Sequence, residues 1–285
     1  MKILILGITG LIGRTLFSQL KKNKSLEVYG SSRNKNEDQH NKEIQYFDYK
    51  YGENFLEKII HEIQPEYIIN CIGVTKHIEG SEDQLVSIPL NSLLPHNISK
   101  VISKSNSKLI QISSDCVYSG KKGDYKEEDT PDSLDLYGRS KAFGEVINNK
   151  DITIRTSTIG HEDKTNYGLL EWFLSQKKSC FGYKNAFFSG LTTFELSNVI
   201  ENYFLTDKSL SGLFHVAGQP ISKFRLLELI AAQYSLDVKI KPNTEFCIDR
   251  TLNSSFFNSK TSYSPPSWEE MIDNMHTDNL GKDDV

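Results

Sequence analysis

The sequence predicts an α/β protein, with a Rossmann-type, doubly wound parallel sheet followed by a smaller C-terminal α/β region. Three observations support this fold class. In the first half, short apolar runs rich in Ile and Leu alternate with segments of helical spacing. Strands that are apolar at successive positions indicate a parallel sheet covered on both faces. A glycine-rich turn directly follows the first strand, and the regular alternation loosens after residue 158.

Each expected strand is a short apolar run, and each expected helix repeats apolar residues three or four positions apart. The strands are expected at 2–7, 26–32, 66–73, 107–114, 151–157 and 213–218. The helices are expected at 11–22, 53–63, 85–105, 135–149, 168–176 and 222–234. Pro89 and Pro95 predict a kink or a late start in the third helix, because proline lacks the amide hydrogen that a helix interior needs. The polar segment 276–285 predicts a disordered tail.

Composition argues against several classes of protein. The formal charge is −4 over 285 residues, and a dedicated nucleic-acid binder would carry a basic stripe. No apolar run approaches the roughly 20 residues that span a bilayer, so we expect neither a nucleic-acid nor a membrane partner. The N-terminal apolar run breaks at Gly7, too early for a signal peptide. The cysteines form no CxxC pair, which favours a cytoplasmic protein without a zinc site or disulfide scaffold; they are Cys71, Cys116, Cys180 and Cys247.

The stretch GITGLIG, residues 7–13, has the strand–turn–helix context of a dinucleotide-binding loop. Its glycines would let the backbone approach a pyrophosphate, and the helix N-terminus adds free N–H groups and a partial positive charge. The spacing is GxxGxxG rather than GxGxxG, so the alternative is an ordinary tight turn. The cofactor-binding residues expected in this loop are Gly7, Thr9, Gly10, Leu11, Ile12 and Gly13.

The end of the second strand favours NADP(H), with NAD(H) as the alternative. An NAD site usually has an acidic residue about 20 positions beyond the glycines, on the ribose 2′-hydroxyl. Arg33 stands there instead, preceded by Ser32, and arginine suits a 2′-phosphate. Asp48 is a candidate for the adenine amino group, or else a helix N-cap. The end of the third strand adds further cofactor candidates, Cys71, Ile72 and Gly73.

The stretch YGRSK places Tyr137 and Lys141 on one face of a helix, at positions i and i+4. An ammonium group close to a phenol lowers the pKa of the phenol. A tyrosine tuned in this way can exchange a proton with a carbonyl–alcohol pair while hydride moves to or from a nicotinamide. A hydroxyl from the serine pair at 113–114 would complete the site. By itself the pattern is common, and the alternative is an exposed helical pair.

Five stretches, GITGLIG, NCIG, ISSDCVY, YGRSK and IRTS, occur in the order and approximate spacing of the extended short-chain dehydrogenase/reductases. The sequence most resembles their dTDP-4-dehydrorhamnose reductase group, strongly to residue 157 and more loosely afterwards. The resemblance implies an NAD(P)-dependent enzyme that reduces the 4-keto group of a nucleotide-activated 4-keto-6-deoxy sugar, for deoxy-sugar and surface polysaccharide biosynthesis. It implies a Rossmann domain over 1–157, with later segments available to its sheet, and a substrate-binding region over 158–275.

The same resemblance implies roles for individual residues. Ser114 matches the catalytic Ser/Thr, and Tyr137 with Lys141 matches the acid–base pair. Asn91 matches a helix asparagine that supports the active site. Arg155 matches the segment that lines the nicotinamide side, so it joins the cofactor candidates.

The substrate side rests on weaker signals. Arg250 suits a diphosphate, or else forms a salt bridge with Asp249. Trp172 would cover the sugar or fill the core. Thr75, Lys76 and His77 follow the third strand, so they face the cleft or remain solvated. The loop after the fourth strand supplies the remaining candidates, Ser114, Asp115 and Cys116.

Several alternatives stay open. A sugar-nucleotide dehydratase is disfavoured, because Cys116 stands where that class needs Glu and a thiol is a poor substitute. A 4-epimerase would use the same Ser–Tyr–Lys set but must hold NAD tightly, and the missing acid near Arg33 argues against it. A bifunctional epimerase–reductase would use Cys116 as proton shuttle if the strand alternation continued to it; otherwise Cys116 is a small apolar filler. A non-catalytic NADP(H)-binding sensor or regulatory subunit is the non-enzyme alternative. No ligand cluster suggests a metal, and a homodimer is one option for the oligomeric state.

Overall fold

The computed structural model describes residues 1–33, 43–46, 53–76, 80–163 and 167–283. Its centre is a seven-stranded sheet in the order β10-β6-β5-β4-β1-β2-β3, in which every neighbouring pair is parallel. This confirms the predicted doubly wound α/β class. The strands are β1 Lys2–Leu6, β2 Glu27–Ser32, β3 Ile44–Tyr46, β4 Tyr67–Asn70, β5 Lys108–Ile112, β6 Ile152–Arg155 and β10 Gly212–His215.

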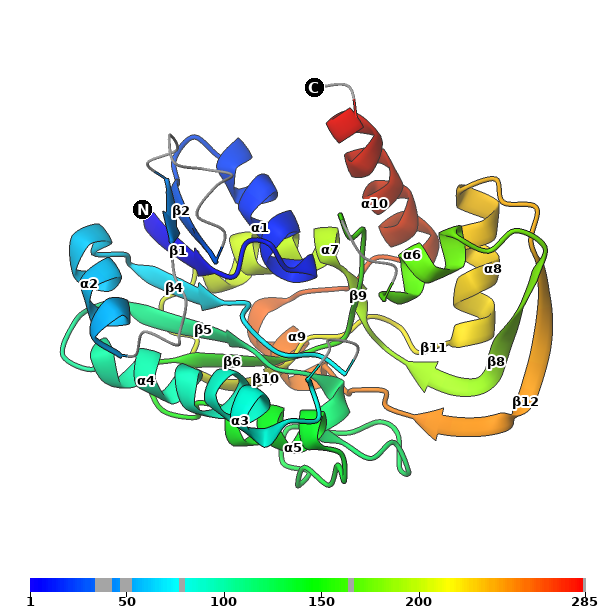
Figure 1. Ribbon diagram of the computed structural model, residues 1–285, viewed down its shortest axis with the longest axis horizontal. Coiled ribbons are helices and arrows are strands. Elements are labelled where there is room, and N and C mark those ends of the chain that lie inside the picture. Colours follow the sequence, from blue (N-terminus) through cyan, green and yellow to red (C-terminus); the bar gives the residue numbers. More distant parts are fainter. Residues whose placement is uncertain (34–42, 47–52, 77–79, 164–166, 284–285) are drawn as a thin grey trace.

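Side chains of β1 alternate between two cores, one on each face of the sheet. Ile3 and Ile5 belong to the larger core, with residues of α1 (Leu11–Lys22) and α7 (Thr193–Val199). Leu4 and Leu6 belong to the smaller core, with residues of α2 (Glu53–Ile63) and α4 (Leu94–Val101). Figure 1 shows these helix pairs on opposite sides of the sheet. The continuous apolar strands therefore reflect burial on both faces.

The third expected helix is divided, as its prolines predict. It runs through α3 (Gln84–Ser87), the π-helical η2 (Ile88–Leu93) and α4. Pro89 and Pro95 each lie at the start of a new segment, where a missing amide hydrogen costs least. The wider π turn lies next to the candidate site, a common position for such turns.

The region beyond residue 157 adds a strand to the main sheet and also forms two smaller sheets. β10 joins the main sheet, and β7 (Thr158–Ile159) pairs with β9 (Leu191–Thr192). A separate sheet has the order β11-β8-β12, and α8 packs against it, at the right of Figure 1. The expected helices at 168–176 and 222–234 appear as α6 (Leu169–Leu174) and α8 (Lys223–Gln233). The strands of the small sheet are β8 Ser179–Phe188, β11 Ile221–Ser222 and β12 Lys239–Asp249, and the remaining elements are η4 Ile200–Phe204 and α9 Ser255–Thr261.

The expected disorder of the tail is wrong for residues 276–283, which belong to α10 (Trp268–Asp283). Met275 is buried in the larger core, so the helix has an apolar anchor. Asp278 accepts hydrogen bonds from Gln19 at 2.6 Å and from Lys22 at 2.8 Å, both on α1. The polar composition of the tail therefore reflects ion pairing with α1 rather than a lack of structure.

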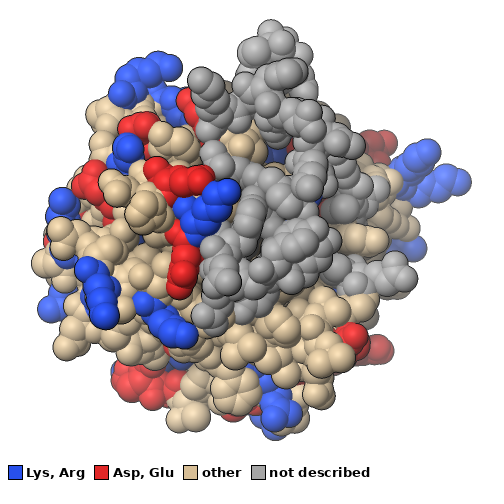
Figure 2. Space-filling view, turned by 60° about the vertical axis from the view of Figure 1, so that its left-hand side comes forward, with Lys and Arg blue, Asp and Glu red and all other residues tan. Residues whose placement is uncertain are grey.

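The charged surface is mixed. On the face in Figure 2, Lys and Arg side chains alternate with Asp and Glu side chains among other residues. Within the described part of the chain, no helix is both long enough and apolar enough to cross a membrane.

Candidate active site

The glycine turn has the backbone geometry that a pyrophosphate loop requires. Gly7 directly follows β1 with φ +88°, a left-handed conformation that favours glycine. A Cβ on Gly13 would overlap the carbonyl oxygen of Gly7, so only glycine lets α1 begin this close to the turn. Gly10 is the N-cap of α1 and offers no side chain to the first N–H groups of the helix. These groups could receive a phosphate.

The ends of β1, β2 and β4 meet at one edge of the sheet. Ser31 accepts a hydrogen bond from the Gly7 amide at 3.2 Å, and Ser32 is buried beside it. Arg33 directly follows the last residue of β2 and is exposed, so it lies at the same edge of the sheet. β1 lies between β2 and β4, where the strand order reverses, which is the usual place of ligands in such sheets. Asp48 lies outside the described residues.

The end of β4 faces both the glycine turn and the catalytic residues. A Cβ on Gly7 would lie 3.0 Å from Ile72, and Cys71 is half-buried at the strand end. A Cβ on Gly73 would lie 3.2 Å from Asn91 Oδ1 and 3.8 Å from Lys141 Nζ. Gly73 is therefore the point where the expected cofactor and catalytic groups converge.

Asn91 holds the loop after β4 in place. Its Oδ1 accepts a hydrogen bond from the Val74 amide at 2.8 Å, and its Nδ2 donates to the Val74 carbonyl at 3.0 Å. Nδ2 also lies 3.0 Å from Ser140 Oγ on α5 (Leu136–Phe143). The π-helical η2 thus fixes the loop and α5 together, a supporting role of the kind expected for Asn91.

Ser114 and Tyr137 meet across two short helices. Ser114 caps η3 (Asp115–Val117), and its Oγ accepts a hydrogen bond from the Cys116 amide at 3.1 Å. A Cβ on Gly138 would overlap the Cys116 carbonyl, so this glycine lets α5 approach η3 closely. Burial raises the pKa of Tyr137 above 10, while its hydrogen bond with Ser114 lowers it. The phenol is therefore protonated at neutral pH, ready to donate.

Lys141 lies on the same helix but is directed to the strand. Its Nζ donates to the Ile112 carbonyl at 2.6 Å, and burial lowers its pKa to about 8. The expected net lowering of the Tyr137 pKa is wrong here, because burial of the phenol outweighs the neighbouring interactions that favour the phenolate. The ammonium instead lies at the end of β5, close to Gly73.

The loop after β5 gathers charges that the sequence did not reveal together. Arg250 donates through Nε to the Tyr118 carbonyl at 3.0 Å, and its Nη1 lies 3.5 Å from Cys116 Sγ. The described contacts of Arg250 thus favour the cleft over the alternative salt bridge with Asp249. Burial raises the pKa of Asp115, and the charges of Lys223 and Arg250 lower it. Lys223, the first residue of α8, carries no motif and was not anticipated.

Cys116 does not continue a strand, because β5 ends at Ile112 and Cys116 belongs to the 3₁₀ helix η3. The strand alternation that would place it beside Ser114 therefore does not apply. Burial raises the pKa of its thiol to about 12. A neutral thiol of this kind is a weak base, which counts against proton shuttling.

Lys76 forms an ion pair with Asp135, the N-cap of α5, at 2.6 Å. Its Nζ lies 5.8 Å from the centre of the Tyr137 ring. Thr75 is exposed beside it, and His77 lies outside the described residues. Lys76 thus borders the site, with its charge partly engaged by Asp135.

Arg155 and Trp172 both contact the core of the protein. Arg155 is 2% exposed and forms a bidentate ion pair with Glu145 at 2.7 Å, so its side chain serves the core in place of the expected cofactor contact. It also hydrogen-bonds Tyr118. Trp172 packs against the larger core from α6, in agreement with the core alternative.

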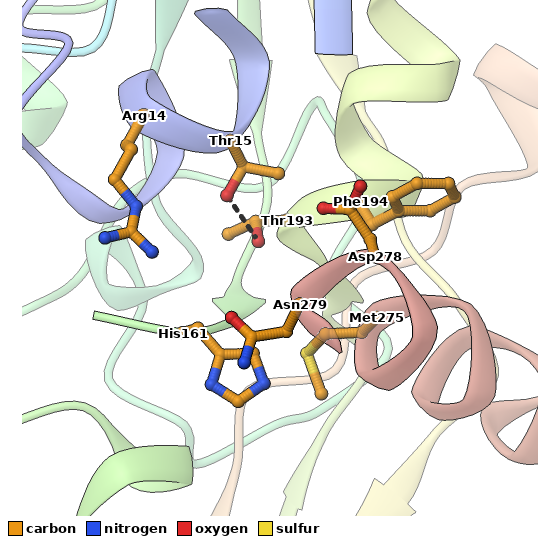
Figure 3. A pocket seen from close by; sticks show the side chains of 8 residues that line it. All are labelled: Arg14, Thr15, His161, Thr193, Phe194, Met275, Asp278 and Asn279. Atoms are coloured by element: carbon orange, nitrogen blue, oxygen red, sulfur yellow. Dashed lines mark hydrogen bonds between the residues drawn. The ribbon is translucent and has the colours of Figure 1, made fainter. Parts of the chain in front are cut away.

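A further pocket lies between α1, α7 and α10, and α1 lines it with Arg14 and Thr15, which directly follow the glycine turn (Figure 3). Thr15 and Thr193 are hydrogen-bonded across it at 3.1 Å. None of the predicted catalytic residues lines it. Its lining residues are Arg14, Thr15, His161, Thr193, Phe194, Met275, Asp278 and Asn279. Among the described residues there is no group of three or more His, Cys, Asp or Glu side chains placed to hold a metal.

Comparison with known proteins places these features in a family. The family model for the RmlD substrate binding domain matches residues 1–279. A dTDP-4-dehydrorhamnose reductase from Aggregatibacter actinomycetemcomitans is 26% identical over 77% of this chain and 74% of its own. The crystal structure of the Bacillus anthracis dTDP-4-dehydrorhamnose reductase in complex with NADP superposes with a TM-score of 0.79, at 22% identity, over 97% of this chain and 99% of that one.

A second kind of relative matches the chain in part. Methionine adenosyltransferase 2 subunit beta from Bos taurus is 32% identical over 50% of this chain. That alignment covers 41% of the relative, so the match spans less than half its length.

Proposed function

The chain belongs to the RmlD substrate binding domain family, and from this membership we propose that it is an NADPH-dependent reductase of a nucleotide-activated 4-keto-6-deoxy sugar. The observation that carries the proposal is the convergence of Ser114, Tyr137 and Lys141 at the sheet edge that also holds the glycine turn. NADP(H) is the favoured cofactor and NAD(H) the alternative, because Arg33 stands where an acid would bind the ribose of NAD. The product would enter deoxy-sugar and surface polysaccharide biosynthesis.

The proposed mechanism assigns one task to each residue. Bound NADPH supplies the hydride that reduces the ketone carbon. Ser114 donates a hydrogen bond to the ketone oxygen and stabilises the charge that develops there. Tyr137, protonated at neutral pH, gives its proton to the oxygen, so that an alcohol and a phenolate result. The positive charge of Lys141 stabilises that phenolate until solvent restores the proton.

Between a simple reductase and a bifunctional epimerase–reductase, the contacts of this site favour the simple reductase. A bifunctional epimerase–reductase needs a second base close to the sugar, and the buried thiol of Cys116 suits that task poorly. We also place the reaction in the cytoplasm, since all four cysteines are free thiols.

NADPH oxidation with a panel of dTDP-, UDP- and GDP-linked 4-keto-6-deoxy sugars tests the proposal. At least one sugar should be turned over, and Tyr137→Phe should lower that turnover by about 10²- to 10⁴-fold. NADPH binding by Tyr137→Phe should remain within twofold of wild type, since the change removes one hydroxyl. If no member of the panel is reduced, the proposal is wrong.

A non-catalytic regulatory subunit is the second candidate, because the partial match to the methionine adenosyltransferase subunit favours it. Such a protein would bind NADP(H) without reducing any sugar of the panel. It would also change the activity of a partner enzyme when mixed with it. The panel assay therefore separates the two candidates.

We also propose a homodimer formed through α5 and its neighbours. Leu93, Phe143 and Ile147 are large apolar side chains that are each more than half exposed. Their segments pack together, and His96 Nε2 lies 2.8 Å from the Phe143 carbonyl. Sedimentation of wild type and Phe143→Asp tests this: the wild type should be a dimer and the variant a monomer.

A further inference from the structure

Two cations from the C-terminal region lie where β11 and β12 pair with the end of β8, and their charges act on Asp115. Arg250 follows β12, and its guanidinium reaches Tyr118 and Cys116. Lys223 begins α8, and its Nζ lies 3.7 Å from the centre of the Phe188 ring at the end of β8. The two basic residues thus directly follow two different strands of the small sheet, Lys223 after β11 and Arg250 after β12, and their charges act on the loop that holds Asp115.

The charges at this place do not cancel. Asp115 is 5% exposed and supplies one negative charge, while Lys223 and Arg250 supply two positive charges that both act on it. Burial lowers the pKa of Lys223, whereas Asp115 raises it and Arg250 lowers it. Lys223 and Arg250 are both partly exposed, and their positive excess beside the buried Asp115 attracts an anionic group from solution.

The ring of Phe188 explains the position of Lys223 only in part. A cation over an aromatic face gains modest energy, and the gain does not require a second cation nearby. Arg250, which suits bidentate contact with phosphate oxygens, donates its backbone amide to the carbonyl of Phe187, the residue next to Phe188. The pair therefore fits a ligand with a compact, multiply charged anionic group.

The proposed substrate has one such group. The sugar ring of a 4-keto-6-deoxy sugar is neutral, so its negative charge lies in the diphosphate. We propose that Lys223, together with Arg250, binds the diphosphate of the nucleotide sugar beside the loop that holds Ser114 and Asp115. This inference rests on the proposed function and names Lys223 as a substrate-binding residue.

Binding of dTDP and UDP to the full chain, measured by calorimetry with NADPH present, tests the inference without turnover. Lys223→Met should raise the dissociation constant about 10- to 100-fold, the size expected for one lost charge-assisted contact. Lys223→Arg should retain affinity within about fivefold, since it keeps the charge. Lys184→Met is the matched control. Lys184 belongs to β8, and its Nζ also lies over an aromatic ring, 5.2 Å from the centre of the Phe224 ring. This control variant should bind both nucleotides as wild type does.

A measurement on the unaltered protein guards against a misfolded variant. Amine acylation followed by peptide mass spectrometry should show that dTDP or UDP protects Lys223 and leaves Lys184 unchanged. Equal labelling of Lys223 with and without nucleotide, or unchanged affinity in Lys223→Met, would overturn the inference. If nucleotide protects Lys223 from acylation but no sugar of the panel supports NADPH oxidation, the proposed reductase activity is wrong and the diphosphate site is still supported.

Discussion

The two sides of the candidate active site are built in different ways. On the Rossmann side, Ser114 bonds the amide of Cys116 and the Asp135 carboxylate bonds the amide of Gly138, so the groups are fixed by near neighbours. On the other side, Arg250 reaches Tyr118 from 132 positions along the chain. The first side is encoded in short motifs, whereas the second exists only once the small sheet has docked.

The largest effect should come from the buried network beneath the Rossmann side. Glu145 joins Arg155 in an ion pair that is almost fully buried, and Ser113 donates to Glu145 at 2.7 Å. Glu145→Gln would leave the guanidinium without its charged partner, so the free energy of unfolding should fall by about 3–5 kcal/mol. Urea unfolding measures this change.

The matched control is Glu228→Gln, which breaks the exposed pair with Arg225. Its urea midpoint should stay close to that of wild type, because exposed pairs contribute little. A similar loss in the free energy of unfolding for both variants would mean that the buried ion pair contributes no more to stability than the exposed one.

The glycine turn should give the next largest effect. A Cβ on Gly13 would overlap the Gly7 carbonyl, whereas one on Gly10 would lie at 3.5 Å, an ordinary contact. Gly13→Ala should therefore lower stability by about 1–3 kcal/mol, and Gly10→Ala should leave it nearly unchanged. Unfolding curves compare the two variants, and NADPH titration should show weaker binding in both. Equal stability would show that the turn relaxes without cost.

The same contrast explains how much the sequence could predict. The parallel sheet, the glycine turn and the YGRSK helix follow from local patterns, and the structure contains all three. Lys223 could not be found in this way, because it begins an ordinary amphipathic helix and gains its place only from the docking of β11 and α8. The strands β8 and β12 were also missed, since their mixed polar and aromatic residues lack the apolar runs of the main sheet.

Two errors have a common physical cause. The polar residues 276–283 predict disorder but form the end of α10, and Arg155 is expected at the cofactor but is buried in the core. In both cases a charged side chain has a charged partner in another element: Asp278 pairs with Lys22 of α1, and Arg155 of β6 pairs with Glu145, which follows α5. Polarity in a sequence indicates exposure only when no such partner exists.

A smaller effect should appear in the pH dependence of the Rossmann side. Lys141 is an ammonium below its pKa of about 8, which burial has lowered from 10.5. As the pH rises through 8, Lys141 loses the charge that stabilises the Tyr137 phenolate. The rate of NADPH oxidation should therefore fall about tenfold for each pH unit above the pKa of Lys141.

Stability should move in the opposite direction over this range. Between pH 8 and 10.5 the unfolded chain keeps the Lys141 proton while the folded chain releases it, so this contribution to stability rises with pH. Lys141→Met should remove the rise, as measured by urea unfolding at several pH values. A rate profile that stays flat to pH 10 would contradict the assigned role of Lys141.

The smallest effect should come from the outer face of the small sheet. Phe181 is 59% exposed on β8, and the rings of Tyr183 and Phe246 lie 5.2 Å apart on the same sheet. The sheet is anchored through its other face, where Gly182 faces Phe224 of α8. Phe181→Ser should therefore change the free energy of unfolding by no more than about 0.5 kcal/mol, the range of ordinary surface substitutions. A loss that grows with protein concentration would show that this face is covered by a second copy, because association stabilises only the folded chain. In that case the substrate side would be fixed by assembly, and its contrast with the motif-encoded Rossmann side would become sharper.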